Sequence, residues 1–479
     1  MDIVNGATHT SEEAGRTLAP FAGGEVVLGM GSPPTRLDPP RMTGRYQSDF
    51  AATRRFLDVG EQMLGTLSTT QRHSRPQDPR ARAVHQACRT ARLAFLAVHA
   101  DQLYAELTDG RRRHLRVDVL CTAAGELMPG LVPTAEQLAE EGRYQQPRKE
   151  GREIDQGLLL WSVLRSPGSG AHLMEAMARP TPRASTLLPA FRADGFVDLG
   201  EVTVERRAGV GHVTVQNQRC LNAEDDAVVE ALETAVDLVL LDDDVRVGVL
   251  RGGVMRHPRY AGRRVFSAGI NLTELYRGGI TFLGFLMRRE MGYIAKMVRG
   301  LAPDPDDPTR RPAAEKPWVG AVDTFAIGGG LQILLAADHV VAEKDAYFSL
   351  PALREGLVPG VANLRLPRLV PSRRARKAIF SDHTIRAGDT DGALLCDAVV
   401  DADEMAEAVA SAAARLADPA VVPNRRMLRL AEEPEDRFRQ YLAEYALEQS
   451  RRIYSEDLFA KLEQTWLARF GSIVAGTKP

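Results

Sequence analysis

The chain has 479 residues, of which 61 are basic and 63 acidic, for a formal net charge of −2. This balance excludes the basic surface expected of a nucleic-acid or membrane-surface binder, so we expect small molecules and other protein chains as partners. The length exceeds one ordinary domain. The sequence shows no basic-then-apolar leader and no run of eighteen apolar residues, which favours a cytoplasmic protein.

The first part of the chain has the pattern of helices. About forty residues rich in Gly and Pro come first and are expected to be loosely ordered. Apolar residues at helical spacing follow, and strand-like alternation is scarce before Phe196. The sequence therefore predicts an α-helical N-terminal region over residues 1–195. Its clearest helical segments are SDFAATRRFLDVGEQML, RAVHQACRTARLAFLAVHADQLYAEL and GLLLWSVLRSPGSGAHLMEAM.

From Phe196 onward, strands and helices alternate. FVDLGEVTVERRAGVGHVTVQNQ has two alternating runs around AGVG, which is typical of a β-hairpin, and VRVGVLRG and KPWVGAVD are further strands. Apolar stripes predict helices over Asn222–Leu241 and Thr281–Leu301, and the Pro- and Asp-rich run at 302–313 predicts an exposed loop. We therefore expect an α/β core at 196–400 and a helical C-terminal region at 401–479.

Two segments of this core share one form, a strand that runs into a turn of small residues and then a helix. They are VFSAGINLTEL and VDTFAIGGGLQILLAADH. Glycine allows a tight turn, and the N–H groups at the start of the following helix have no partners inside the helix. Such N–H groups, aided by the helix dipole, favour an oxyanion. One such turn is equally well explained by packing, whereas two in succession indicate an anion-binding site.

FSAGINL, then GGGLQILLAAD about sixty residues later, then FSLPALREGLVPG, resemble the enoyl-CoA hydratase/isomerase (crotonase) superfamily. The resemblance covers about Phe196–Gly360. It implies a spiral of repeated ββα units, followed by C-terminal helices that contribute to a CoA site and to oligomer contacts. It also implies a homo-oligomer, either a trimer or a dimer of trimers (a homohexamer).

The resemblance assigns roles to the two glycine turns. It implies that the backbone N–H groups of Ile270 and Gly329 hold the thioester oxygen of an acyl-CoA as it becomes an enolate. Ala268, Gly269 and Gly330 of the same turns are expected beside the substrate.

Gln332, in GGGLQ, departs from the hydratases of this superfamily. Those enzymes carry a glutamate at the matching position and a second glutamate where this chain has Ala352. Because neither an amide nor a methyl group can transfer the proton that water addition requires, we expect no ordinary hydratase. The enolate chemistry is expected to be retained and the water chemistry lost.

One branch of the superfamily is similar to this chain in having a glutamine in the GGG-x-Q motif and a long helical region before the core. Its members are cofactor-independent dioxygenases that act on 3,5-dihydroxyphenylacetyl-CoA in antibiotic biosynthesis. The resemblance therefore implies that this chain converts that thioester and O2 to 3,5-dihydroxyphenylglyoxylate and CoA. Gln332 is then expected beside the reacting carbon and the oxygen.

The sequence predicts neither a metal nor an organic cofactor. Its four cysteines are scattered without CxxC spacing, which predicts free thiols. Its one HxD run, from His99 to Asp101, has helical periodicity and not the rigid β scaffold expected of an iron oxygenase site. No GxGxxG motif follows a strand. The substrate carbanion is therefore expected to reduce oxygen itself.

Two charged residues stand out by their helical positions. Arg289 falls on the apolar stripe of TFLGFLMRREMGYIAKM, where burial without a partner would be costly, so a function is favoured. Arg288 falls off the stripe and is expected to be solvated. Glu224 extends the stripe of LNAEDDAVVEALETAVDLVLL, and an acid that merely complements the helix dipole is its alternative explanation. The resemblance implies that Arg289 and Glu224 bind the two ring hydroxyls.

Arg219, His257 and Tyr260 lie where the resemblance implies the path of CoA, although a solvated loop histidine is the simpler explanation of His257. Two other functions stay open. One is a different crotonase-type hydrolase or isomerase that consumes no oxygen. The other is a non-catalytic CoA-binding scaffold whose helical region binds a partner protein.

Overall fold

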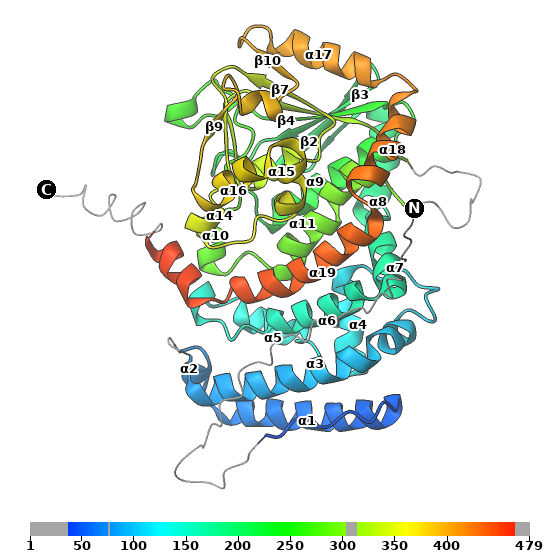
Figure 1. The fold of residues 1–479 in the computed structure, drawn as a ribbon, viewed down its shortest axis with the longest axis vertical. Helices are drawn as coiled ribbons and strands as arrows, with labels where there is room; N and C mark the ends of the chain where they lie inside the picture. The colour runs from blue at the N-terminus through cyan, green and yellow to red at the C-terminus, as the bar shows by residue number, and fades with distance from the viewer. Residues whose placement is uncertain (1–36, 75–76, 303–313, 465–479) are drawn as a thin grey trace, which may run out of the picture.

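The computed structural model describes residues 37–74, 77–302 and 314–464 (Figure 1). The predictions for most of the Gly- and Pro-rich start, for the loop at 303–313 and for the end of the last helical segment lie outside these residues. In the view of Figure 1, layers of helices form the lower part of the molecule and the strands lie in the upper part.

Helices occupy the N-terminal region, as predicted. Several begin at a Ser, Thr or Asp whose side-chain oxygen accepts a hydrogen bond from the first turn, as Thr134 and Thr181 do. The elements are α1 (Tyr46–Thr66), α2 (Thr69–Arg72), α3 (Pro79–Leu107), α4 (Val117–Leu127), α5 (Ala135–Glu141), η1 (Gln146–Arg148), α6 (Glu153–Arg165), α7 (Pro167–Ala178) and α8 (Pro182–Asp194).

Helix α6 joins this region to the rest of the molecule. Every residue from Asp155 to Leu164 is buried, because α6 packs against α3 on one side and against α19 (Glu435–Arg452) on another. A helix that is apolar on most of its circumference belongs in an interior. The C-terminal helix α19 therefore lies between the N-terminal helices and the α/β core, as Figure 1 shows.

The larger sheet has the strand order β1-β2-β3-β4-β5-β7-β10. Its first three strands are antiparallel, and β4, β5, β7 and β10 are added in parallel. Ala208 and Gly209 make the predicted hairpin turn, both with positive φ as a two-residue turn of this hand requires. The strands are β1 (Phe196–Asp198), β2 (Val202–Arg207), β3 (Val210–Val215), β4 (Val247–Gly252), β5 (Trp318–Val322), β7 (His339–Glu343) and β10 (Ala398–Val400).

A smaller sheet, in the order β6-β8-β9, completes the predicted spiral of ββα units. In two successive units, one strand enters the large sheet, the next enters the small sheet, and a helix follows. The units are β5, β6 (Phe325–Ile327) and α13 (Gly329–Leu334), then β7, β8 (Tyr347–Ser349) and α14 (Ala352–Glu355), with β9 (Ile385–Arg386) closing the small sheet.

The two faces of the large sheet are covered by different helices. Val247, Val249 and Val319 face α17, whereas alternate residues such as Leu250 join the main core with α9. The remaining elements are α9 (Asp226–Leu241), η2 (Pro258–Tyr260), α10 (Leu272–Arg277), η3 (Phe282–Met287), α11 (Arg288–Met291), α12 (Tyr293–Arg299), α15 (Ala362–Leu369), α16 (Ser372–Phe380), η4 (Gly392–Leu394), α17 (Met405–Leu416) and α18 (Val421–Glu432).

The helix predicted over 281–301 is wrong in detail, because it is divided into a π-helical turn (η3), α11 and α12. The break lies at Gly292, whose φ of −91° and ψ of −111° are not helical. A Cβ atom there would lie 2.3 Å from the carbonyl oxygen of Arg288 and 2.8 Å from Oε1 of Glu233. The glycine thus makes room for a carboxylate that comes from α9.

No helix in the described ranges combines the length and the apolar composition that crossing a membrane demands.

Candidate active site

The two glycine turns lie against each other. Gly269 and Gly328 have positive φ values of 85° and 52°, which glycine adopts without the steric cost of a Cβ. A Cβ atom on Gly269 would lie 3.3 Å from the backbone nitrogen of Gly329. A bridge between Ser267 and Ala326 joins the same two segments. Turns that are distant in the sequence therefore form one surface.

The residue after each of these glycines presents a backbone N–H. The N–H of Gly269 donates to Oγ of Ser267 (3.0 Å), and that of Gly328 donates to the carbonyl of Ser349 (2.8 Å). By contrast, the N–H groups of Ile270 and Gly329 donate to no acceptor in the described part of the chain. Two adjacent N–H donors of this kind can hold an oxyanion.

The other turn residues pack the two segments together. The N–H of Ala268 donates to the carbonyl of Leu221 (3.1 Å). A Cβ atom on Gly330 would lie 2.9 Å from Cβ of Ser267, so a glycine is needed for α13 to approach the first turn.

Arg289 connects the buried polar groups behind these turns. Its guanidinium, in a residue only 3% exposed, donates to Glu224 (Nε–Oε2, 2.8 Å), Glu290 (Nη1–Oε1, 2.7 Å), Gln332 (Nη1–Oε1, 2.7 Å) and the Gly329 carbonyl (Nη2–O, 2.6 Å). Burial opposes the charge, but the facing carboxylates of Glu224 and Glu290 hold the pKa of Arg289 well above its usual value. The arginine is therefore a fixed cation at the base of the oxyanion turns.

Glu224 is not a first-turn residue of a helix, so that alternative is wrong. Helix α9 begins at Asp226, and Glu224 is held in an extended bridge by the carbonyl of Gly269 and the N–H of Asn271. Its buried carboxylate accepts hydrogen bonds from Arg289 and from the hydroxyl of Tyr293 (2.7 Å).

The prediction that Arg288 is solvated is also wrong. Its Nε donates to Oε2 of Glu233 at 2.6 Å, and Glu233 is fully buried. Arg116 (2.7 Å) and Lys296 (2.9 Å) contact the same carboxylate. Burial disfavours the charge of Glu233, yet these three cations lower its pKa. The Arg288 side chain is thus only 23% exposed, because a neighbouring helix supplies an ionic partner to this position off the apolar stripe.

The place of Gln332 explains why an amide stands there. Its amide oxygen accepts a hydrogen bond from Arg289, while its amide nitrogen donates to no acceptor within the described ranges. Arg289 already faces two carboxylates, Glu224 and Glu290, so this cluster carries one more negative than positive charge. A third carboxylate at position 332 would raise that excess to two. An amide supplies the acceptor without that charge.

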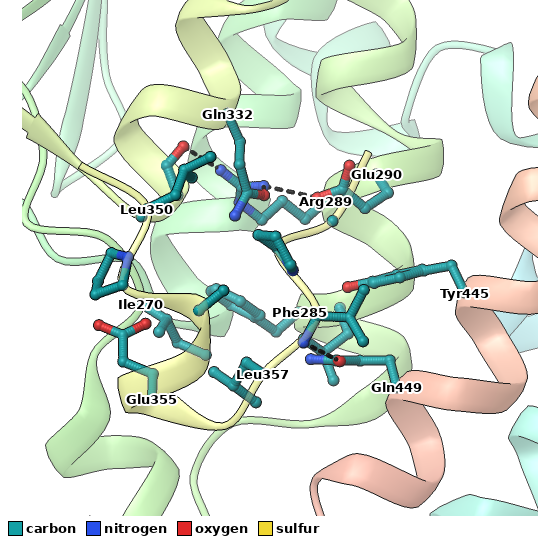
Figure 2. A pocket seen from close by; sticks show the side chains of 18 residues that line it. Ile270, Phe285, Arg289, Glu290, Gln332, Leu350, Glu355, Leu357, Tyr445 and Gln449 are labelled. Atoms are coloured by element: carbon teal, nitrogen blue, oxygen red, sulfur yellow. Dashed lines mark hydrogen bonds and ion pairs between the residues drawn. The ribbon is translucent and has the colours of Figure 1, made fainter. Parts of the chain in front are cut away.

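These groups border a cavity of about 40 Å³ (Figure 2). The walls come from the two glycine turns, from η3 and α11, from the segment 350–360, and from α19. Ala352, which the resemblance matches to the second glutamate of the hydratases, lies in the wall.

Four further polar residues of the wall were not predicted from the sequence. They are Glu290, Glu355, Tyr445 and Gln449. Glu290 follows Arg289 directly, and Glu355 comes three residues after Ala352, so their closeness to these two positions could have singled them out. Tyr445 and Gln449 share one face of α19 at i and i+4, but nothing in the sequence shows what that face contacts.

The three residues expected on the CoA path lie outside the cavity wall. The side chain of Arg219 is 84% exposed and pairs with Glu201 (2.9 Å). His257 is exposed before η2, and Tyr260 packs edge-on against Phe325 with ring centroids 5.3 Å apart.

No group of three or more His, Cys, Asp or Glu residues is arranged to hold a metal ion in the ranges that the structure describes. The four cysteines are free thiols, as predicted. His99 lies in helix α3, as its periodicity predicted, and shares a hydrogen bond with Asp49 (2.7 Å).

Known proteins resemble this chain to different extents. The enoyl-CoA hydratase/isomerase family model matches residues 308–449. The (3,5-dihydroxyphenyl)acetyl-CoA 1,2-dioxygenase of Amycolatopsis orientalis is 51% identical over 402 residues, which are 84% of this chain and 92% of that protein. The short-chain-enoyl-CoA hydratase of Clostridium acetobutylicum is 27% identical over 210 residues, 44% of this chain and 72% of that protein. A solved enoyl-CoA hydratase/isomerase of Pseudoalteromonas atlantica is 21% identical with a TM-score of 0.46, covering 56% of this chain and 97% of that one.

Proposed function

This chain belongs to the enoyl-CoA hydratase/isomerase family, and we propose that it is a dioxygenase of 3,5-dihydroxyphenylacetyl-CoA. It converts the thioester and one O2 to 3,5-dihydroxyphenylglyoxylate and CoA. The observation that carries the proposal is the 51% identity to the Amycolatopsis dioxygenase, which extends over 84% of this chain and so includes much of the helical N-terminal region.

The two glycine turns stabilise the enolate in this proposal. The N–H groups of Ile270 and Gly329 donate to the thioester oxygen, which gains negative charge when a proton leaves the α-carbon. Their lack of protein acceptors in the described chain supports this role. Ala268, Gly269 and Gly330 bring the two donors together.

The residues at 332 and 352 direct the enolate away from hydration. Gln332 and Ala352 both border the cavity, and neither can pass a proton to or from water. In the proposal, the free amide nitrogen of Gln332 orients the thioester or the incoming oxygen.

The proposal also assigns residues near the cavity to recognition of the aromatic ring and of CoA. Arg289 borders the cavity, and Glu224 contacts it through Arg289, so this pair reads the two ring hydroxyls. Arg219, His257 and Tyr260 lie along the outer path of CoA.

The oxidation requires no reductant besides the substrate. After proton loss, the carbanion passes one electron to O2, and the two radicals combine as a peroxide at the α-carbon. The peroxide attacks the thioester carbonyl and expels the CoA thiolate. Loss of the second α-proton with cleavage of the O–O bond leaves the ketone and the carboxylate. We propose that this enzyme uses neither a metal nor an organic cofactor.

The proposal also includes a cytoplasmic homo-oligomer, a trimer or a dimer of trimers, that supplies an arylglyoxylate for antibiotic biosynthesis. Light scattering on the protein as it elutes from a size-exclusion column measures the mass of the oligomer directly.

An oxygen electrode tests the proposed function. With 3,5-dihydroxyphenylacetyl-CoA, we expect one O2 consumed per CoA released, and no hydration of a short enoyl-CoA. CoA release without oxygen uptake would instead identify a hydrolase. An intact thioester in air would identify a binding protein.

A further inference from the structure

We infer that Glu355 is the general base that removes the α-proton of the thioester. This inference rests on the proposed function, which requires a carbanion but has so far assigned no group to accept its proton.

The ionisable side chains of the cavity wall leave few choices for this base. They are Arg289, Glu290, Glu355 and Tyr445. Arg289 is a permanent cation, and burial together with the nearby Glu290 raises the pKa of Tyr445 well above its usual value, so neither accepts a proton at neutral pH.

Glu290 is already committed to two other partners. Its Oε1 accepts from Nη1 of Arg289 (2.7 Å), and its Oε2 accepts from the N–H of Val361 (3.1 Å). The residue is 1% exposed. Glu290 is thus a fixed partner that holds Arg289 and the segment after β8 in place.

Glu355 stands where a base can reach the substrate. It is three residues after Ala352 on α14, so both side chains share a face of that helix. A Cβ atom on Gly328 would lie 4.0 Å from Oε2 of Glu355, which places the carboxylate beside the second oxyanion turn. In Figure 2 this carboxylate lies near Ile270 of the first oxyanion turn. Glu355 therefore supplies, one helical turn later, the carboxylate that is absent at position 352.

The step is a single proton transfer. The bond between the α-carbon and its hydrogen breaks, the proton joins a carboxylate oxygen of Glu355, and the electron pair delocalises onto the thioester oxygen held by Ile270 and Gly329. The same proton is available to the CoA thiolate when that group leaves.

Hydrogen exchange without oxygen tests this step apart from oxidation. Wild-type enzyme and 3,5-dihydroxyphenylacetyl-CoA are mixed anaerobically in D2O, and deuterium at the α-carbon is followed by mass spectrometry. General bases contribute about 10²- to 10⁴-fold, so we expect Glu355→Gln to slow exchange at least about 100-fold. Its substrate Kd, measured anaerobically, should stay within about threefold of wild type.

Three variants complete the design. Glu432→Gln changes an exposed carboxylate at the end of α18 and should exchange at the wild-type rate. Glu355→Asp should exchange at an intermediate rate, and it decides the question if Glu355→Gln fails to fold. Glu290→Gln tests the competing base.

Wild-type exchange in a folded, substrate-binding Glu355→Gln or Glu355→Asp variant would overturn the inference. The inference would also be overturned if Glu290→Gln abolished exchange while Glu355→Gln did not. A wild-type enzyme that exchanges α-hydrogen but consumes no oxygen in air would overturn the proposed function and leave the role of Glu355 intact.

Discussion

Arg289 gathers four acceptors around one planar cation, and three of them come from side chains of different segments. A guanidinium has five donors in a fixed fork, whereas a lysine presents three donors from one atom. The geometry of this cluster therefore depends on arginine and not on positive charge alone.

Arg289→Lys should weaken binding of the hydroxylated ring more than binding of an unsubstituted ring. We expect the Kd of 3,5-dihydroxyphenylacetyl-CoA to rise about tenfold more than that of phenylacetyl-CoA, a difference of about 1.4 kcal/mol. Anaerobic titration measures both constants. Arg277→Lys, at an exposed arginine of α10, should change neither. Equal weakening for the two thioesters would show that Arg289 does not read the ring.

Gln332→Glu should lower oxygen uptake by one to two orders of magnitude, about 1.4 to 2.8 kcal/mol. The new carboxylate adds negative charge beside Glu224, Glu290 and the developing carbanion and peroxide. It should not create a hydratase, because Ala352 leaves water with half of its acid-base pair.

Oxygen uptake and hydration of a short enoyl-CoA are measured side by side for this variant. Gln332→Met, uncharged and similar in length, separates the effect of charge from loss of the amide. Unchanged oxygen uptake in Gln332→Glu would make Gln332 a packing residue.

For single residues, the sequence predicted which side chains and turns come together at the cavity but not how charges are paired. Ile270, Gly329, Gln332 and Arg289 all border one cavity, as their motifs and periodicity indicated. Arg288 was misjudged because helical periodicity describes one helix and does not show the buried Glu233 of its neighbour.

Among the elements, η3, α11 and α12 show how packing overrides periodicity. The apolar stripe predicted one continuous helix, and its aromatic residues Phe282, Phe285 and Tyr293 are indeed buried. The break at Gly292 follows from the carboxylate of Glu233, which packs against that glycine. No local pattern in the sequence contains this contact.

Helix α5 carries a buried acid that makes stability depend on pH. Glu141, its last residue, accepts a hydrogen bond from the N–H of Gly151 (2.9 Å). Burial, with Glu153 nearby, raises its pKa to about 7. Between the ordinary carboxyl pKa and about 7, the folded protein binds a proton that the unfolded chain releases. This contribution to stability is therefore lost as pH rises through that window.

Glu141→Gln should remove this dependence. From pH 5 to pH 8, we expect the wild type to lose on the order of 3 kcal/mol more than the variant, because one pKa unit corresponds to about 1.4 kcal/mol. Urea unfolding at both pH values measures the difference. Glu126→Gln, at an exposed position of α4, serves as the control. Parallel losses in wild type and Glu141→Gln would contradict the assignment.

For the whole molecule, the sequence predicted the order of helical region, α/β core and C-terminal helices. It could not predict that α19 lies between α6 and the cavity, because that contact joins segments far apart in the sequence, as in the hydrogen bond from Trp161 of α6 to Glu444 of α19, 283 residues away. Tyr445 and Gln449 bring this helix to the site, where Gln449 accepts from the N–H of Val358 (3.0 Å).

Activity should survive exhaustive chelation. If the substrate carbanion is the reductant, dialysis against a strong chelator should leave oxygen uptake within about twofold of the untreated enzyme. Metal content is measured on the same sample by mass spectrometry. Loss of turnover that iron restores would show that the cofactor-free proposal is wrong.

Oxygen-isotope labelling tests the central claim most directly. The proposed reaction places both atoms of one O2 in the product, one in the ketone and one in the carboxylate. Under 18O2, with immediate borohydride reduction to fix the ketone oxygen, the product should be four mass units heavier than under 16O2, with one CoA released for each. A shift of two mass units, or none, would contradict a dioxygenase.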